Sequence, residues 1–183
     1  MPPLTIPRVF RPMLAALLST AALVASAADA QRQAEVARRG AEVMPFSLAA
    51  TTHVFTETAD GGVQRVVAKR ADDAKQIALV REHLHAIQAA FSKGDFSAPA
   101  QIHGMQMPGL ATLKAAKPGQ IVIAYQDVPA GAELTYRSAD ATLVAAIHRW
   151  FGAQLADHGH DAMAGAMHHA GGMMMMGGMP ASK

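Results

Sequence analysis

Histidine and methionine are concentrated near the C-terminus in a pattern typical of metal binding. Residues 158–179 hold four of the nine histidines and seven of the twelve methionines, together with six glycines. No helical or strand period in this segment would bury these side chains. Thioether sulfur is a soft ligand that suits Cu(I), and imidazole suits copper, zinc and nickel. The predicted ligands of the segment are His158, His160, Met163, Met167, His168, His169, Met173, Met174, Met175, Met176 and Met179. The alternative is a low-complexity end that binds no metal.

A second set of candidate ligands, His103, Met105 and Met107, lies in the middle of the chain. If this stretch is extended, alternate residues project to the same side, and one imidazole and two thioethers converge. Such a set suits Cu(I). In the alternative interpretation, Met107 caps the core, His103 bonds to backbone and Met105 is exposed, because methionine is also a common filler of core gaps.

The remaining histidines are weaker candidates. His83 and His85 point about 200° apart if they lie on a helix, so we predict that both are solvated residues at its flanks. His53 could face the region of His103, but the sequence does not place it. His148, at the edge of a predicted helix, is expected to be structural.

Composition excludes several classes of protein. The chain has no cysteine, which excludes disulfides, thiolate catalysis and cysteine-ligated zinc or iron–sulfur sites. From residue 31 onward, 14 Lys and Arg balance 13 Asp and Glu, and no basic run is interleaved with aromatics, so nucleic acid is not an expected partner. The sequence motifs of serine hydrolases, phosphate-binding loops and zinc proteases are absent.

The first thirty residues resemble a signal peptide. Arg8 and Arg11 precede an apolar run that is too short to span a bilayer, and small residues follow it. We predict cleavage after Ala27 or Ala30, export to the periplasm and no membrane insertion afterwards. The domains expected are a signal peptide (1–30), a leader helix or linker (31–46), a folded α+β domain (47–158) and a disordered tail (159–183).

Two halves of the domain have the same predicted order, a β-hairpin followed by a long helix. Residues 51–58 are rich in β-branched side chains, residues 63–70 alternate between apolar and polar, and a turn at 59–62 joins them. An amphipathic helix with Asp72 or Asp73 as its cap follows. Residues 119–127 and 132–137 form the second hairpin, before a helix capped by Ser138 or Asp140. An ungapped offset of 67 residues aligns the two halves. We therefore predict two ββα repeats, with one four-stranded antiparallel sheet, two long helices on one face and a short connector helix from Pro108.

Several segments of the domain resemble a family of small exported proteobacterial proteins of uncharacterised function. These segments are MPFSLAATTHVFT, ADGGVQRVVAK, IHGMQMPGL, IAYQDVPAGAELTYRS and ADATLVAAIHRWFGAQLADHG. Some members of that group carry an aspartate carbamoyltransferase label. This chain lacks the Ser-Thr-Arg-Thr phosphate-binding signature of those enzymes and is too short for their two domains.

The function expected from the sequence is binding of a metal ion in the periplasm, with a copper ion first and other divalent metals as alternatives. Sequestration, delivery or tolerance would be its role, and a periplasmic copper transporter or oxidase its partner. The competing hypothesis is a module that binds a small ligand or a protein, with a solvating tail; an enzyme comes third.

Overall fold

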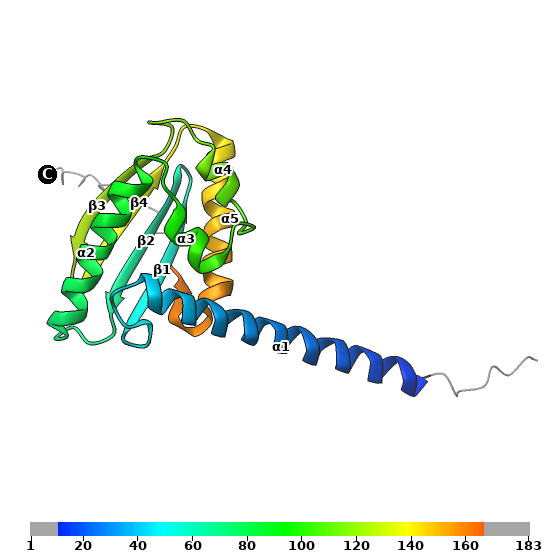
Figure 1. The fold of residues 1–183 in the computed structure, drawn as a ribbon. Helices are drawn as coiled ribbons and strands as arrows, with labels where there is room; N and C mark the ends of the chain where they lie inside the picture. Colours follow the sequence, from blue (N-terminus) through cyan, green and yellow to red (C-terminus); the bar gives the residue numbers. More distant parts are fainter. Residues whose placement is uncertain (1–10, 167–183) are drawn as a thin grey trace, which may run out of the picture.

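Two β-hairpins join edge to edge to form most of one sheet. The structure, a computed structural model, describes residues 11–166, with side chains from residue 27 onward. β1 (Thr51–Thr58) and β2 (Gly61–Ala68) form the first hairpin, and β3 (Val122–Val128) and β4 (Gly131–Arg137) the second. β2 pairs with β4 in antiparallel register, and the strand order is β3-β4-β2-β1-β5 (Figure 1). The fold class is therefore α+β, as predicted.

The fifth strand corrects the prediction of a four-stranded antiparallel sheet. β5 (Ala162–Ala164) lies beside β1 and runs parallel to it, so the sheet is mixed. After the last long helix the chain turns through η3 (Gly159–Asp161), and the backbone N–H of Gly165 then donates to the carbonyl of Phe55 at 2.8 Å. Residues 159–166, predicted as the beginning of a disordered tail, are thus built into the edge of the sheet. The rest of that predicted tail lies outside the described residues.

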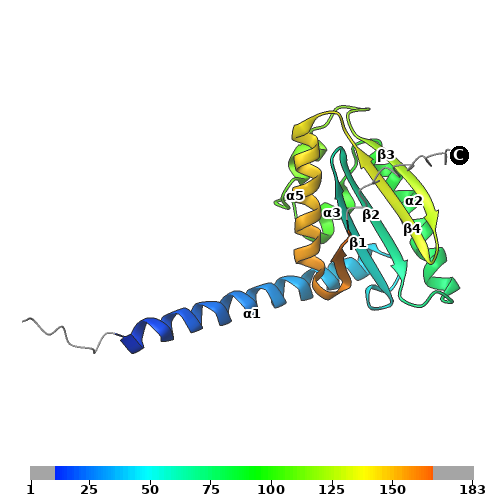
Figure 2. The same cartoon turned by 180° about the vertical axis from the view of Figure 1, so that it is seen from behind.

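Both long helices cover the same face of the sheet. α2 (Ala74–Phe91) packs mainly on β3 and β4, and α5 (Ala141–His158) packs on β1 and β2. Phe151 of α5 contacts Phe55 and Tyr136, and Phe91 of α2 also contacts Tyr136. Successive side chains of a strand point to opposite faces of the sheet. Only alternate residues of β1 and β4 therefore face the helices and are buried. The view from behind shows the strands with α2 beyond them (Figure 2).

Aspartate caps determine where the two helices begin. Asp73 accepts a hydrogen bond from the backbone N–H of Gln76 at 3.1 Å. Asp140 accepts one from Thr142 at 2.8 Å. One of the two residues proposed for each cap is confirmed.

The two ββα halves do not keep one ungapped register. The helices start at Ala74 and Ala141, 67 residues apart, whereas the second strands of the hairpins start at Gly61 and Gly131, 70 residues apart. The offset of 67 therefore holds for the helices and is wrong for the hairpins, because the chain between hairpin and helix is shorter in the second half.

The connector between α2 and β3 contains two short helices, where we predicted one. α4 (Leu110–Lys114) buries Leu110 and Leu113, as expected for the predicted connector helix. α3 (Ser97–His103) was not predicted, and it ends at His103, so residues 103–107 form a helix end and a turn. The expected extended conformation of this stretch is wrong.

The N-terminal helix, α1 (Arg11–Val43), is the longest in the described chain, and η2 (Leu48–Ala50) follows it. α1 runs through both predicted cleavage points and touches the domain only near its C-terminal end (Figure 1). Residues 27–31 are exposed, and the first fully buried side chain is Val36. None of the helices within residues 11–166 is long and apolar enough to cross a membrane.

Two glycines of positive φ provide a matched test of how the connector is held. Gly109 (φ 82°) lies against the backbone of α5, where an added Cβ would collide with the carbonyl oxygen of Ala146. Gly94 (φ 78°) has open space around it. We predict that Gly94→Ala lowers the free energy of unfolding by about 1–2 kcal/mol, the cost of a left-handed residue. Gly109→Ala should cost clearly more in urea denaturation, and equal losses would contradict the close packing.

Candidate functional site: a buried histidine cluster

Four histidines from four elements border one small, partly open cavity. His53 of β1, His83 of α2, His103 of α3 and His158 of α5 line a space of about 50 Å³. The rings of His53 and His158 are stacked with centroids 4.8 Å apart, and His103 meets His158 edge to face at 5.1 Å. We define these four residues as the histidine cluster. Histidine is rarely gathered in a core, so this is the most unusual feature of the described chain.

Strand and helix periodicity place these side chains inside. His53 faces inward because it alternates with the buried Thr51 and Phe55. His158 lies one turn after Gln154, which is one turn after Trp150, so all three fall on the buried side of α5. The inner stripe of α5 thus changes from apolar to polar where it reaches the cavity.

His103 is held by a carboxylate. Its Nδ1 lies 2.8 Å from Oδ2 of Asp157, which the guanidinium of Arg32 binds in turn at 2.7 Å. Arg32 Nε also donates to Oδ1 at 2.9 Å. Because Asp157 is ionised, Nδ1 of His103 donates the hydrogen, and Nε2 is the ring nitrogen with a lone pair when the ring is neutral. This is how a carboxylate orients a metal-ligating or proton-accepting histidine.

Burial lowers the pKa of three histidines of the cluster, His53, His83 and His158. It lowers the pKa of His53 to about 3, helped by the nearby His158 and His83. It lowers the pKa of His158 to about 4, with a further contribution from His103 and an opposing one from Asp157. The pKa of His83 is also lowered by burial. For Asp157, burial favours the protonated acid, but the hydrogen bonds from His103 and Arg32 outweigh it and hold the pKa below its usual range.

Three polar atoms near the cavity have no hydrogen-bond partner among the residues that the structure describes. They are Nδ1 of His53, Nε1 of Trp150 and Oε1 of Gln154, each on a side chain that is buried. All three residues line the cavity. A buried donor or acceptor without a partner costs about 1–3 kcal/mol, so such groups normally bind water, an ion or a ligand. The cavity therefore offers both donors and acceptors to a small occupant.

The structure places the three residues of the predicted loop site differently from one another. His103 is buried against Asp157, Met107 is 5% exposed in the core, and Met105 is 59% exposed beside Lys114. The helix that ends at His103 and the turn after it send the three side chains into different surroundings. Of this set, only His103 belongs to the cluster.

The other predicted residues are placed more widely. His158 is in the cluster, whereas His160 and Met163 are exposed at the edge of the sheet. The prediction that His83 and His85 are both solvated is wrong for His83, which borders the cavity, and holds for His85. His148 is structural, as expected: its Nε2 bonds to the carbonyls of Thr58 and Gly61. The remaining predicted ligands lie outside the described residues: Met167, His168, His169, Met173, Met174, Met175, Met176 and Met179.

No three His, Asp or Glu side chains between residues 27 and 166 are placed to hold a metal ion together. Comparison with known proteins does not identify the cluster either. No family model, curated protein or solved structure matches this chain. Its chemistry must be inferred from the geometry alone.

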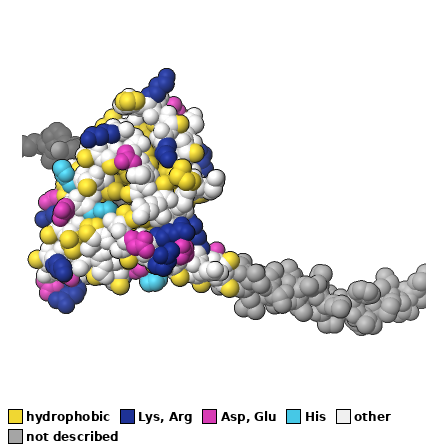
Figure 3. Space-filling view, in the orientation of Figure 1, with side chains coloured by type: hydrophobic (Ala, Val, Ile, Leu, Met, Phe, Trp, Pro, Cys, Tyr) yellow, Lys and Arg dark blue, Asp and Glu magenta, His cyan; other side chains and the backbone are white. Residues whose placement is uncertain are grey.

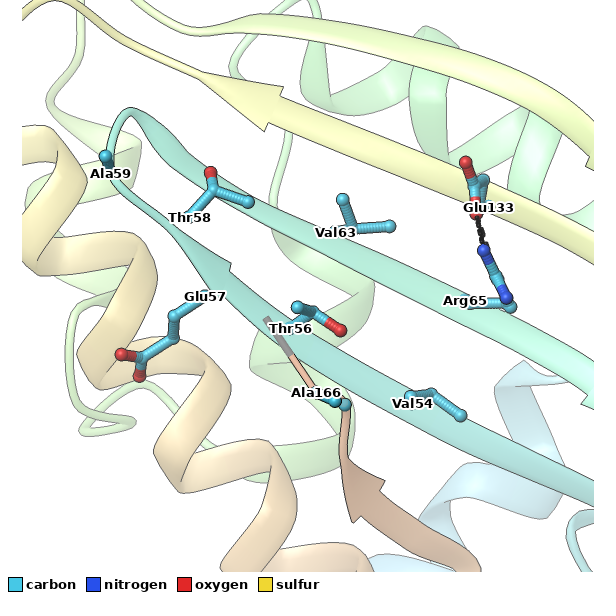
Figure 4. A pocket seen from close by; sticks show the side chains of 10 residues that line it. Val54, Thr56, Glu57, Thr58, Ala59, Val63, Arg65, Glu133 and Ala166 are labelled. Carbon is cyan, nitrogen blue, oxygen red and sulfur yellow. Dashed lines mark hydrogen bonds and ion pairs between the residues drawn. The ribbon is translucent and has the colours of Figure 1, made fainter. Parts of the chain in front are cut away.

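The opposite face of the sheet carries a second hollow. Val54, Thr56, Val63 and Ala166 border an open groove of about 520 Å³, and an ion pair between Arg65 and Glu133 lies at one end (Figure 4). On the helical side, positive and negative side chains are interspersed, with no large area of one sign (Figure 3).

We predict that the metal-free protein loses stability in mild acid. The unfolded chain binds protons at histidine near pH 6.5, whereas folded His53 and His158 resist protonation until about pH 3 and 4. As pH falls from about 6.5 to 4, the free energy of unfolding should fall, by up to about 1.4 kcal/mol per pH unit for each histidine. The lowered pKa of Asp157 adds a loss of stability only at the acid end of this range, below about pH 5, where the unfolded carboxyl begins to bind a proton.

Urea denaturation at several pH values measures this slope. His53→Leu removes one of the contributing histidines and should reduce the slope between pH 6 and 4.5, while His158 and His83 still contribute. A wild-type free energy of unfolding that does not change over this range would contradict the neutral, buried state of the cluster.

Proposed function

We propose that this chain is an exported, periplasmic copper-binding protein whose tight site is the histidine cluster. One observation carries the proposal: His103, with Nδ1 bound to Asp157, adjoins His158, which stacks on His53, and burial keeps His53 and His158 unprotonated. Neutral imidazole is the form that ligates a metal, so low pKa values reduce competition from protons. The carboxylate–histidine pair is the arrangement that orients ligands in many metal sites.

The geometry favours Cu(I) over zinc. Structural zinc sites need four converging ligands, but no three His, Asp or Glu groups converge in the described part of the chain. Cu(I) accepts as few as two ligands, and the adjoining His103 and His158 offer two imidazoles. Met44 also borders the cavity and brings a soft thioether to it.

The tail has a separate proposed role. Its histidines and methionines would capture copper weakly, and the cluster would retain one ion tightly. Sequestration, delivery or copper tolerance in the periplasm are the processes that such a protein serves, with a periplasmic copper transporter or oxidase as its partner. Burial along α1 supports the proposed export, because packing on the domain begins only after the predicted cleavage points at Ala27 and Ala30.

A variant of His103 tests the site. His103→Asn keeps a donor for Asp157 but removes Nε2, so we expect Cu(I) affinity at the tight site to fall at least tenfold. His85→Asn, on the exposed side of α2, is the matched control and should bind as the wild type does. Competition against a Cu(I) chelator measures both, and thermal unfolding checks that the variants fold. Wild-type affinity in His103→Asn would remove the cluster from the function.

Truncation separates the cluster from the tail. A chain that ends at Ala166 keeps β5 and every residue of the cluster. We predict that it binds fewer Cu(I) ions than the full chain but retains one ion with unchanged affinity. Met105→Leu should not alter that retained site, since Met105 is exposed. A truncated chain that binds no copper would make the tail the only metal-binding element.

The groove on the open face favours a second candidate function, binding of a small organic ligand. Its volume of about 520 Å³ lies within the range of small-molecule sites, and it combines an apolar floor with an ion pair. Metal content after purification without a histidine tag distinguishes the two functions. Bound copper supports the first, and metal-free protein favours the groove.

A further inference from the structure

The C-terminal turns of α1 form one wall of the histidine cavity. Val36 is fully buried against the domain, and Val43, Met44 and Phe46 border the cavity directly. Contacts of α1 with α3 and α5 hold this wall in place. The side chain of Gln33 adds a hydrogen bond to the carbonyl of Ala156 at 3.1 Å. The cluster is thus completed by a segment that lies outside the two ββα units.

Arg32 is the polar centre of this contact. Its guanidinium binds both oxygens of Asp157, and Nη2 also donates to the backbone carbonyl of His103 at 2.7 Å. His103 is the last residue of α3, and Asp157 lies in the last turn of α5. Both helices present their negative ends there, so a positive guanidinium stabilises the two ends together. Arg32 therefore joins three helices at one point.

We propose that Arg32 is the positioning residue that makes His103 competent to bind a ligand. By holding Asp157 in a fork, Arg32 fixes the carboxylate oxygen that accepts from Nδ1, and Nε2 remains the ring nitrogen with a lone pair. Docking of α1 and formation of the binding site are then one event. This inference rests on the proposed function for the identity of the ligand, but not for the arrangement of the ring.

Asp157 depends on Arg32 for its orientation. Oδ2 is shared between His103 and Arg32, whereas Oδ1 has Arg32 Nε as its side-chain partner. The Asp157 side chain is only 11% exposed, so water replaces a lost partner poorly. Without Arg32 the carboxylate can rotate, and neutral His103 can then exchange its proton between the two ring nitrogens.

Arg38 provides a matched control on the same helix. It also forms ion pairs with carboxylates, but its partners, Glu35 and Glu42, belong to α1 itself. Replacing Arg38 removes a positive charge and local ion pairs while leaving Asp157 and His103 untouched. The comparison of Arg32→Gln with Arg38→Gln therefore isolates the contact with Asp157.

The experiment has two readouts. Nitrogen-15 NMR of the histidine rings in the metal-free protein near pH 7.5 reports which nitrogen of His103 carries the proton. We expect a single tautomer, protonated at Nδ1, in the wild type and in Arg38→Gln, and a mixture in Arg32→Gln. Competition titration with Cu(I) should show at least a tenfold loss of affinity for Arg32→Gln and none for Arg38→Gln. Arg32→Lys keeps the positive charge but cannot bind both carboxylate oxygens at once. We expect its His103 tautomer ratio and its Cu(I) affinity to lie between those of the wild type and Arg32→Gln.

The outcomes separate the two proposals. If Arg32→Gln keeps one tautomer, or keeps its Cu(I) affinity while the tautomers mix, Arg32 does not position the ligand and the inference is overturned. If the tautomers respond as expected but the wild type binds no Cu(I), positioning stands and copper binding fails. Thermal unfolding identifies a variant that does not fold. If Arg32→Gln does not fold, Arg32→Lys decides the question. A single tautomer of His103 together with wild-type Cu(I) affinity in Arg32→Lys would overturn the role of the two-pronged guanidinium contact.

Discussion

A carboxylate that must stay charged inside the protein organises the functional end of this molecule. Asp157 is ionised although it is nearly buried, and it can remain so only because Arg32 and His103 both bind it. These contacts fix the position of Arg32 on α1 relative to the C-terminal ends of α3 and α5. The apolar core alone would not specify these positions, because apolar contacts tolerate small shifts that a bidentate ion pair does not.

The covered face of the sheet holds both the structural core and the candidate site. The covered face contains an aromatic core around Trp150 and Tyr136 at one end and the histidine cluster at the other. The rings of His53 and His158 are buried at the end of this hydrophobic layer, so a positive charge on either of them is costly. The site is consequently shaped to prefer neutral imidazoles, and the rigid sheet and helices beneath it keep them in place.

Much of the framework was predictable because it depends on local patterns. The alternation in β1 and β2, the steps of three and four in α2 and α5, and the caps Asp73 and Asp140 each leave a signature in the sequence. β5 left none, since a strand of only three residues is too short to show a period and pairs because the edge of β1 is close by. α3 was missed because proline and small residues obscure its period.

The site was less predictable because its members are far apart in the sequence. Arg32 and Asp157 are 125 residues apart, and no local rule relates them. One signal was present: Gln154 and His158 continue the inner stripe of α5 at positions where an apolar residue is expected. A polar residue at a position of a helix that should face the core is therefore a better sign of a site than histidines that are close in sequence. The alternate spacing of His103, Met105 and Met107 did not bring their side chains together, because α3 ends at His103 and a turn follows.

The short pairing of β5 with β1 has a consequence for exchange between sites. It fastens the chain to the sheet beside His53, only a few residues after His158. The chain that follows is joined to the sheet at that point, so an ion bound by the tail, as proposed above, would meet the cluster at a high effective concentration that does not depend on how dilute the protein is. Transfer of an ion from the tail to the histidine cluster would then be an intramolecular step, and its rate would depend on the length of chain between them.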